Sequence, residues 1–238
     1  CVRNGWAYIH PDFRGPNRNP TATGSGLAIQ DVLDAVAYAK NHANVNPDRV
    51  YLTGASGGGY MSLLMAGRSP GTFAAVSAWV PISDLDAWHR DSTARRNKYA
   101  GDIEKSCGGK PGTSPAVDEQ YRLRSPIHWL HLAKGVPIDI NAGIRDGHAG
   151  SVPVGHTLRA FNVLAHKKDR LTDEEIGHFV KQAKVPAHLP KAAPDSSFDD
   201  KQPLFRRTSG TVRVTLFDGG HEMVPSALVN WLKEQAGS

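Results

Sequence analysis

A serine enclosed by glycines is the part of this sequence best suited to chemistry. Ser56 lies in the sequence TGASGGGY (residues 53–60), after an apolar segment and before a helix-forming one. This pattern predicts a tight strand-to-helix turn, a nucleophile elbow, which points the serine hydroxyl into a cleft. The glycines two residues before and after it, Gly54 and Gly58, are expected to remove Cβ atoms where strand and helix crowd together. Ser56 is therefore the candidate nucleophile.

Two other kinds of glycine-rich loop require residues that this chain lacks. A phosphate-binding loop needs a Lys-Ser/Thr pair after its last glycine, where this chain has Tyr60 and Met61. A dinucleotide-binding loop needs a glycine at the position of Ser56 and an acid about twenty residues later, where residues 75–80 carry no acid. An ordinary strand-to-helix loop without a catalytic role is the remaining structural alternative.

A serine hydroxyl becomes a nucleophile when a histidine removes its proton and a carboxylate orients that histidine. On a strand-and-helix scaffold of this kind the three residues follow in the order Ser, acid, His. His221 has the right order and lies in the sequence DGGHE (residues 218–222), directly after the apolar segment 211–217. Because it then lies on a loop at the carboxyl end of a strand, His221 is the candidate base.

Several carboxylates compete for the role of the orienting acid. Asp146 follows the apolar segment 136–141 and precedes a helical segment, so it is the first candidate. Asp84 follows the apolar segment 74–80 and is the main rival, although it also suits a helix N-cap. Asp218 is too close in sequence to the histidine. Two others fall on the predicted helix 27–40 as solvated or capping residues: Asp31 and Asp34.

Five short motifs spread over most of the chain carry a resemblance to a known family. They are Asp12-Phe13-Arg14-Gly15, Asp48-Arg49-Val50 ahead of the elbow, Ser125-Pro126, Asp146 before Val152-Pro153, and Gly219-Gly220-His221-Glu222. Together they resemble an α/β-hydrolase of the prolyl oligopeptidase-like (peptidase/esterase) group. The resemblance implies Ser56 as nucleophile, Asp146 as acid, His221 as base and the amide of Gly57 as one oxyanion donor. It also implies ester or peptide hydrolysis through an acyl-enzyme.

The start of the chain departs from that group. Its members carry further strands before the Asp-x-Arg-Gly motif, together with a His-Gly-type loop that supplies a second oxyanion donor. Here the segment with this motif follows Cys1 almost directly. We therefore expect that an amino-terminal part is missing, and that the chain without it is a weak catalyst or a binding module.

Alternating strands and helices predict the fold class. The pattern indicates an α/β fold with a mostly parallel central sheet covered by helices on both faces, which is the α/β-hydrolase fold. Residues 1–238 are expected to form a single catalytic domain with insertions at about 84–132 and 167–210. Strands are expected at residues 6–10, 49–53, 74–80, 136–141 and 211–217.

Both insertions have a structural and a functional interpretation. The second places a helix between acid and histidine, opened by a capping box from Thr172 to Glu175 and ending near Lys184. An irregular, proline-rich connection follows it, which either shapes access to the cleft or is a surface excursion. The first insertion offers aromatic and imidazole rings that either line a pocket or pack the core: Trp88, His89, Tyr121, Trp129 and His131.

The composition of the chain indicates which kinds of partner and ligand are not expected. The net charge is +5, but the basic residues are scattered, so nucleic acid is not expected as a partner, and a preference for acidic substrates is only a weak hypothesis. No apolar run approaches membrane-spanning length, so no membrane partner is expected. Cys1 and Cys107 permit at most one disulfide, and His128 and His131 lack a third ligand, so neither a metal nor a cofactor is predicted. Oligomeric state and compartment stay open, with secretion or a periplasmic location among the alternatives.

The reaction that these residues predict is hydrolysis of carboxylic esters by a Ser-His-Asp triad through an acyl-enzyme. Esters, small or linked to a polymer, are placed first because no gating domain that would select peptides is visible. A prolyl oligopeptidase-like serine peptidase is the alternative, since the same triad cleaves amides. An α/β-hydrolase-fold binding module with impaired catalysis is the third reading.

Overall fold

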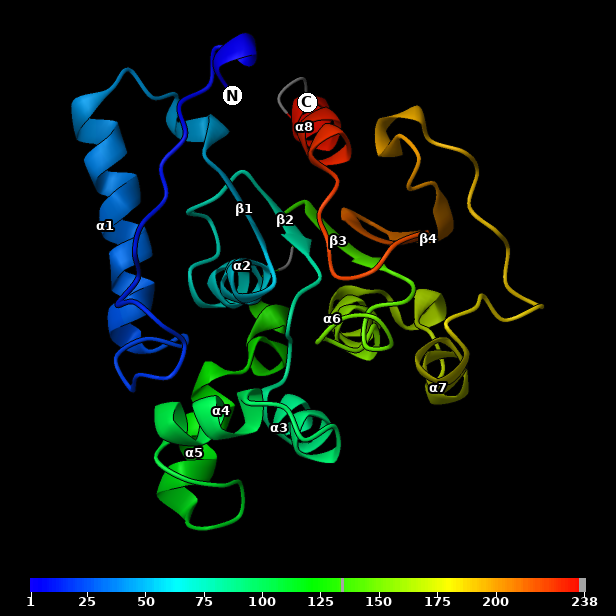
Figure 1. Cartoon of the computed structure of the whole chain (residues 1–238). Coiled ribbons are helices and arrows are strands. Elements are labelled where there is room, and N and C mark those ends of the chain that lie inside the picture. The colour runs from blue at the N-terminus through cyan, green and yellow to red at the C-terminus, as the bar shows by residue number, and fades with distance from the viewer. Residues whose placement is uncertain (134, 236–238) are drawn as a thin grey trace.

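The computed structural model describes residues 1–133 and 135–235 of the chain. A five-stranded sheet in the order β1-β2-β3-β5-β4 forms its centre (Figure 1). Strands β1, β2, β3 and β5 run parallel, and β4 pairs antiparallel with β5. The strands are β1 Tyr51–Ala55, β2 Ala75–Trp79, β3 Ile138–Gly143, β4 Pro203–Ser209 and β5 Val212–Phe217. The predicted, mostly parallel sheet is confirmed.

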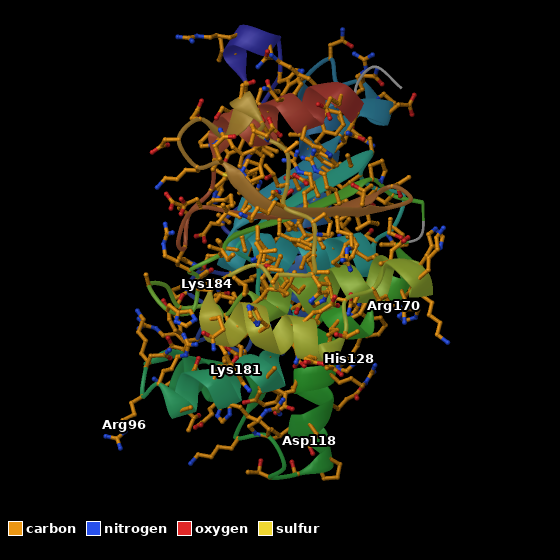
Figure 2. The ribbon with its side chains drawn as sticks, turned by 90° about the vertical axis from the view of Figure 1, so that its right-hand side faces the viewer. Arg96, Asp118, His128, Arg170, Lys181 and Lys184 are labelled. Carbon is orange, nitrogen blue, oxygen red and sulfur yellow. The ribbon has the colours of Figure 1, made fainter. Side chains whose placement is uncertain are left out.

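Helices cover both faces of this sheet. Figure 1 shows α2 and α6 below the strands and α8 above them, and Figure 2 shows the same layers from the side. The helices are α1 Gly26–His42, α2 Gly57–Arg68, α3 Leu85–Ala94, α4 Tyr99–Cys107, α5 Pro115–Arg124, α6 Gly155–Leu164, α7 Asp173–Gln182 and α8 Pro225–Gln235. Short 3₁₀ helices lie at Val2–Asn4, Pro47–Arg49, Pro126–His128, Leu130–Leu132, Lys167–Asp169 and Ser196–Phe198. No helix within the described residues has the length and apolar character needed to cross a bilayer.

Burial follows from the layered arrangement. Every residue of β2 and of β3 is buried, as expected for central parallel strands with helices on both faces. On one face α2 packs against β1 and β2, and its residues 59–67 are buried. Trp79 at the end of β2 is fully buried, and its ring lies 5.9 Å from that of Phe217 in β5. The core therefore fixes the carboxyl ends of the parallel strands relative to one another.

The strand expected at residues 6–10 is not formed. These residues are irregular, and residues 7–10 are exposed. Trp6 packs its ring 5.9 Å from the ring of Tyr51 in β1, but the segment makes no backbone ladder with that strand in the part of the chain that the structure describes. An apolar pattern becomes a strand only where its backbone pairs with a neighbouring strand, and among the described residues this segment forms no hydrogen bonds with the edge strand β1.

The sheet nevertheless has five strands, because one strand that was not predicted is formed. Residues 203–209, expected to be part of the irregular connection, form β4 beside β5. The two strands are joined by a tight turn that contains Gly210 at φ 59°. The Ser209-Gly210 pair before an apolar run is a hairpin signal that the sequence analysis missed.

The helix predicted between acid and histidine is confirmed. Its capping box is complete, since Thr172 Oγ1 accepts from the Glu175 amide at 3.1 Å and Glu175 Oε2 accepts from the Thr172 amide at 2.7 Å. The helix, α7, ends at Gln182 and packs against α6. Most of residues 183–202 are irregular, as expected.

Candidate active site

Ser56 occupies a strained turn at the end of β1. Its φ and ψ are 55° and −116°, a conformation that costs free energy for any residue with a Cβ atom. The turn is held by a hydrogen bond of 2.9 Å from the Ser56 amide to the carbonyl of Trp79 in β2. Helix α2 begins at the next residue, Gly57. This is the geometry expected of a nucleophile elbow.

The glycines around the elbow differ in how much space a Cβ atom would have at each position. A Cβ atom on Gly54 would lie 2.4 Å from the carbonyl carbon of Gly58, so the predicted crowding is confirmed at Gly54. A Cβ atom on Gly58 would meet nothing within 4 Å, so the prediction is wrong there. Gly59 is the second crowded position, because its Cβ atom would lie 2.4 Å from the Trp79 carbonyl oxygen. It lets α2 pack closely on β2.

Asp146 and His221 form a hydrogen-bonded pair. His221 Nδ1 lies 2.7 Å from Asp146 Oδ2, and the carboxylate is buried, whereas 23% of the His221 side chain is exposed. Asp146 Oδ1 accepts the amides of Gly147 at 2.9 Å and Val152 at 3.2 Å. Because a carboxylate only accepts, Nδ1 carries the proton and Nε2 of the neutral ring has a free lone pair.

Two glycines that the sequence analysis did not single out let the backbone approach closely around this pair. A Cβ atom on Gly150 would lie 2.3 Å from Asp146 Oδ1 and 2.6 Å from His221 Cβ. One on Gly143, the last residue of β3, would lie 2.2 Å from the carbonyl oxygen of Gly220. Glycines on both sides of a candidate acid were the signal available in the sequence.

The rival carboxylates have other partners. Asp84 caps α3, since its Oδ1 accepts the amides of Asp86 at 3.0 Å and Ala87 at 3.2 Å. The helix-cap interpretation of Asp84 is therefore confirmed. The others are also engaged elsewhere: Asp218 with Arg145, Asp31 with Arg14, and Asp34 with Gln30.

The topology places the three predicted residues at one edge of the sheet. Strands β1, β3 and β5 run parallel, and Ser56, Asp146 and His221 each follow the carboxyl end of one of them. The acid and histidine are brought into contact. No hydrogen bond joins Ser56 Oγ to His221 among the residues described. Such bonds are often formed only when substrate is bound.

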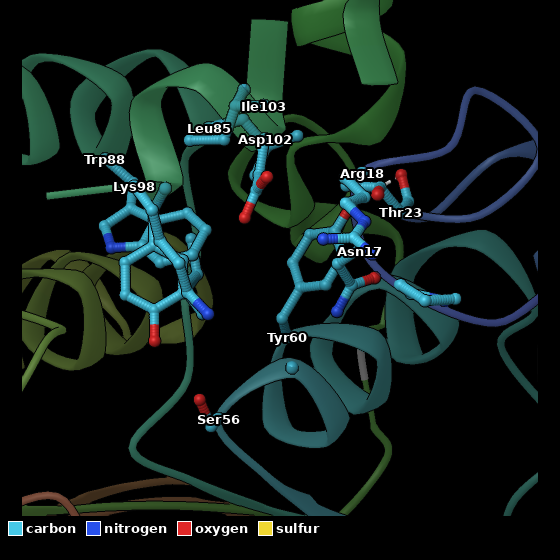
Figure 3. A pocket seen from close by; sticks show the side chains of 14 residues that line it. Asn17, Arg18, Thr23, Ser56, Tyr60, Leu85, Trp88, Lys98, Asp102 and Ile103 are labelled. Carbon is cyan, nitrogen blue, oxygen red and sulfur yellow. Dashed lines mark hydrogen bonds between the residues drawn. The ribbon is translucent and has the colours of Figure 1, made fainter. Parts of the chain in front are cut away.

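A cavity of about 230 Å³ opens beside Ser56 (Figure 3). One wall comes from the first insertion, where the rings of Trp88 and Tyr99 stack with centroids 4.9 Å apart. The opposite wall is a loop that precedes α1. Its lining residues are Pro16, Asn17, Arg18, Thr23, Ser56, Gly57, Tyr60, Ile82, Leu85, Trp88, Lys98, Tyr99, Asp102 and Ile103.

Of the rings offered for a pocket by the first insertion, Trp88 alone lines this cavity. Three of the others have partners elsewhere: His89 Nε2 lies 2.8 Å from Glu104, Tyr121 donates to Gly109 O at 3.1 Å, and Trp129 donates to Leu123 O at 3.1 Å. His131 is exposed outside the cavity.

The sequence analysis missed most of the polar lining. Arg18 and Lys98 supply two positive charges and Asp102 one negative charge to the cavity. Tyr60 donates its hydroxyl to the carbonyl of Arg124 at 2.7 Å, and burial raises the pKa of Tyr60, so this phenol stays protonated. These residues come from segments distant in sequence, and no local pattern marks them.

Comparison with known proteins gives a consistent family and fold. The profile of the prolyl oligopeptidase family matches residues 22–189. The uncharacterized peptidase YtmA of Bacillus subtilis is 29% identical over 146 residues, which are 60% of this chain and 52% of YtmA. The chain thus spans about half the length of this curated relative.

Two solved structures resemble the chain over most of its length. A puromycin-hydrolyzing peptidase of Mycobacterium tuberculosis has a TM-score of 0.53 at 16% identity, covering 92% of this chain and 25% of that one. Oligopeptidase B of Leishmania major has a TM-score of 0.54 at 13% identity, covering 92% of this chain and 23% of that one. They show the α/β-hydrolase fold. With a matching profile over more than half its length, the chain belongs to the prolyl oligopeptidase family of serine hydrolases.

Proposed function

We propose that this protein is a serine peptidase in which Ser56 attacks the amide carbonyl, His221 is the base and Asp146 orients it. The observation that carries the proposal is the 2.7 Å hydrogen bond between Asp146 and His221, at the same sheet edge as the strained Ser56 turn. The residues alone ranked ester cleavage first. Membership in a peptidase family and a relative named as a peptidase reverse that order.

The proposed reaction uses the tautomer that Asp146 imposes. His221 Nε2 takes the proton of Ser56 as Oγ bonds to the carbonyl carbon, and the carbonyl oxygen gains negative charge beside the Gly57 amide. The imidazolium then gives its proton to the leaving amine as the C–N bond breaks. Water, deprotonated by the same nitrogen, attacks the acyl-enzyme and releases the carboxylic acid.

The cavity supplies the proposed binding site for the substrate beside the scissile bond. Its wall of Trp88 and Tyr99 offers stacked rings to an apolar side chain. Residues 1–238 act in this proposal as one catalytic domain, with the first insertion as one wall of the binding site. The proposed substrates are peptides, and no preference for particular amino acids in the substrate is proposed.

Active-site labelling and a matched substrate panel test this function. A fluorophosphonate should label the wild-type protein on Ser56 and leave Ser56→Ala unlabelled. Peptide amides and esters with the same acyl group should both be hydrolysed, with loss of both activities in Ser56→Ala. Turnover of esters without any turnover of amides would restore the esterase interpretation. Absence of an adduct, with hydrolysis at the same background rate in the wild type and in Ser56→Ala, would favour a binding module.

A further inference from the structure

Residues 146–152 form the acid loop, and the side chain of Trp88 joins this loop to the cavity. Trp88 on α3 lines the cavity, where its ring stacks on that of Tyr99 with centroids 4.9 Å apart. Its Nε1 donates a hydrogen bond of 3.3 Å to the carbonyl oxygen of Ser151. In Figure 3 this nitrogen lies on the far side of the ring from Tyr60. The ring therefore faces the cavity while its N–H bonds to the acid loop.

A single peptide group connects this hydrogen bond to Asp146. The Ser151 carbonyl and the Val152 amide belong to the same planar peptide unit. The Val152 amide donates to Asp146 Oδ1 at 3.2 Å, and Asp146 Oδ2 accepts from His221 Nδ1 at 2.7 Å. A contiguous series of hydrogen bonds thus runs from the indole, through one peptide unit and the carboxylate, to the imidazole. Hydrogen bonds in such a series polarise one another.

A second contact with the acid loop comes from the same side of α3. Arg95, the C-cap of this helix, donates from its guanidinium to the carbonyl oxygen of Gly147. Arg95 follows Trp88 by seven residues, which is about two helical turns, so both side chains leave the helix on one side. The Gly147 amide in turn donates to Asp146 Oδ1 at 2.9 Å. Helix α3 therefore holds the loop beside both of the amides that bind the carboxylate.

The acid loop needs such external donors because its own backbone is soft. Two of its seven residues are Gly147 and Gly150, and glycine permits a wider range of φ and ψ than other residues. Fixing the Ser151 carbonyl fixes the direction of the Val152 N–H, since the peptide unit is planar. The Asp146 side chain is only 1% exposed, so bulk water does not replace a lost N–H donor there.

We propose that Trp88 is a positioning residue for the orienting carboxylate. Its indole N–H, acting through the Ser151–Val152 peptide, holds Asp146 in the orientation that meets His221. The inference rests on the proposed function and extends the catalytic support to a residue of the first insertion. Trp88 then has two separable parts, a ring that forms a wall of the cavity and an N–H that fixes the acid loop.

The test removes the N–H and keeps an aromatic ring. Trp88→Phe retains a ring beside Tyr99 and loses the donor to Ser151. Trp129→Phe is the matched control, because Trp129 lies outside the cavity lining and its indole also donates to a backbone carbonyl, that of Leu123 at 3.1 Å. The same chemical change at the two positions separates loss of any indole hydrogen bond from loss of this one.

In Trp88→Phe, kcat for a peptide amide should fall about 10- to 100-fold, the order expected when a catalytic group is displaced by up to about 1 Å. The KM should change by less than about threefold, because an aromatic wall is kept. Trp129→Phe should keep the wild-type kcat and KM. Urea unfolding gives the folded fraction of each variant, and kcat is expressed per folded protein.

A double-mutant cycle with Asp146→Ala tests whether Trp88 acts through the carboxylate. Hydrolysis of a p-nitrophenyl ester is followed with enzyme in excess, and the rate of Ser56→Ala is subtracted. Once the carboxylate is absent, adding Trp88→Phe should change the rate by less than about twofold. A residue that acts only by touching the substrate would instead cause its full loss in both backgrounds.

Three outcomes would overturn the proposal: an unchanged kcat in Trp88→Phe, an equal loss in Trp129→Phe, or a full loss from Trp88→Phe that persists in the Asp146→Ala background. Failure of the proposed function looks different and removes both proposals. In that case fluorophosphonate does not label the wild-type protein, and the wild type hydrolyses substrate at the rate of Ser56→Ala. Labelling on Ser56 together with an unchanged kcat in Trp88→Phe rejects the role of Trp88 alone.

Discussion

At the scale of single residues, the carboxylate of Asp146 controls the tautomer of His221. Replacing it with a carboxamide keeps the shape but allows an N–H to face Nδ1, which favours the wrong tautomer. We expect Asp146→Asn to lower kcat by up to about 10⁴-fold. Asp84→Asn is the control, because asparagine caps a helix as well as aspartate, and it should keep both turnover and stability. Loss of activity in Asp84→Asn instead would make Asp84 the acid.

Gly150 lies against the Asp146–His221 pair, so its substitution tests whether the geometry of this pair matters for turnover. In Gly150→Ala the new methyl group would lie 2.3 Å from Asp146 Oδ1 and 2.6 Å from His221 Cβ, so the pair must separate and turnover should fall. Gly177→Ala on α7 is the control, since its Cβ atom meets nothing within 4 Å. It should raise the free energy of unfolding by about 1 kcal/mol through helix propensity and leave kcat unchanged. Normal turnover in Gly150→Ala would contradict this account.

At the scale of elements, the junction of β1 and α2 depends more on Gly54 than on Gly58. A methyl group on Gly54 would lie 2.4 Å from the Gly58 carbonyl carbon, whereas one on Gly58 would meet nothing within 4 Å. We expect Gly54→Ala to lower the free energy of unfolding by about 1–3 kcal/mol or more, because backbone must move. Gly58→Ala should change it by less than about 1 kcal/mol. Urea unfolding measures both, and equal effects would show that the junction is not crowded.

The elements also show where local patterns suffice. The helix caps at Asp84 and Thr172 were readable because each involves residues only two or three positions apart. Residues 6–10 were expected to form a strand and do not, whereas residues 203–209 were expected to be irregular and form β4. The reason is that a strand forms only where a partner strand pairs with it. The first segment has no ladder among the described residues, whereas the second pairs with β5.

At the scale of the whole molecule, buried His156 links folding to pH. It is 4% exposed, and burial lowers its pKa to about 3, so the ring is neutral near pH 7. Its Nδ1 accepts from the Ser83 amide at 3.3 Å. The ring also lies 3.8 Å from the carboxylate of Asp91, but a neutral imidazole forms no ion pair there.

Protonation of His156 therefore favours the unfolded chain. Below pH 6.5, the ordinary histidine pKa, the unfolded state binds a proton that the folded state refuses, so this residue's contribution to stability falls between about pH 6.5 and 3. We expect the free energy of unfolding of His156→Gln to fall less steeply with decreasing pH than that of the wild type. His131→Gln, at an exposed position, should keep the wild-type slope. Equal slopes for all three proteins in urea titrations from pH 4 to 8 would refute this.

The sequence by itself determined the features that depend on neighbours along the chain. The elbow at Ser56, the helix caps and the order of serine, acid and histidine follow from local chemistry and from the alternation of strands and helices. Tertiary structure alone decided which carboxylate meets the His221 ring and that Trp88 donates to the loop that carries this carboxylate. Such contacts join segments that are far apart in sequence, so packing against a shared core sets them, and no short pattern records them.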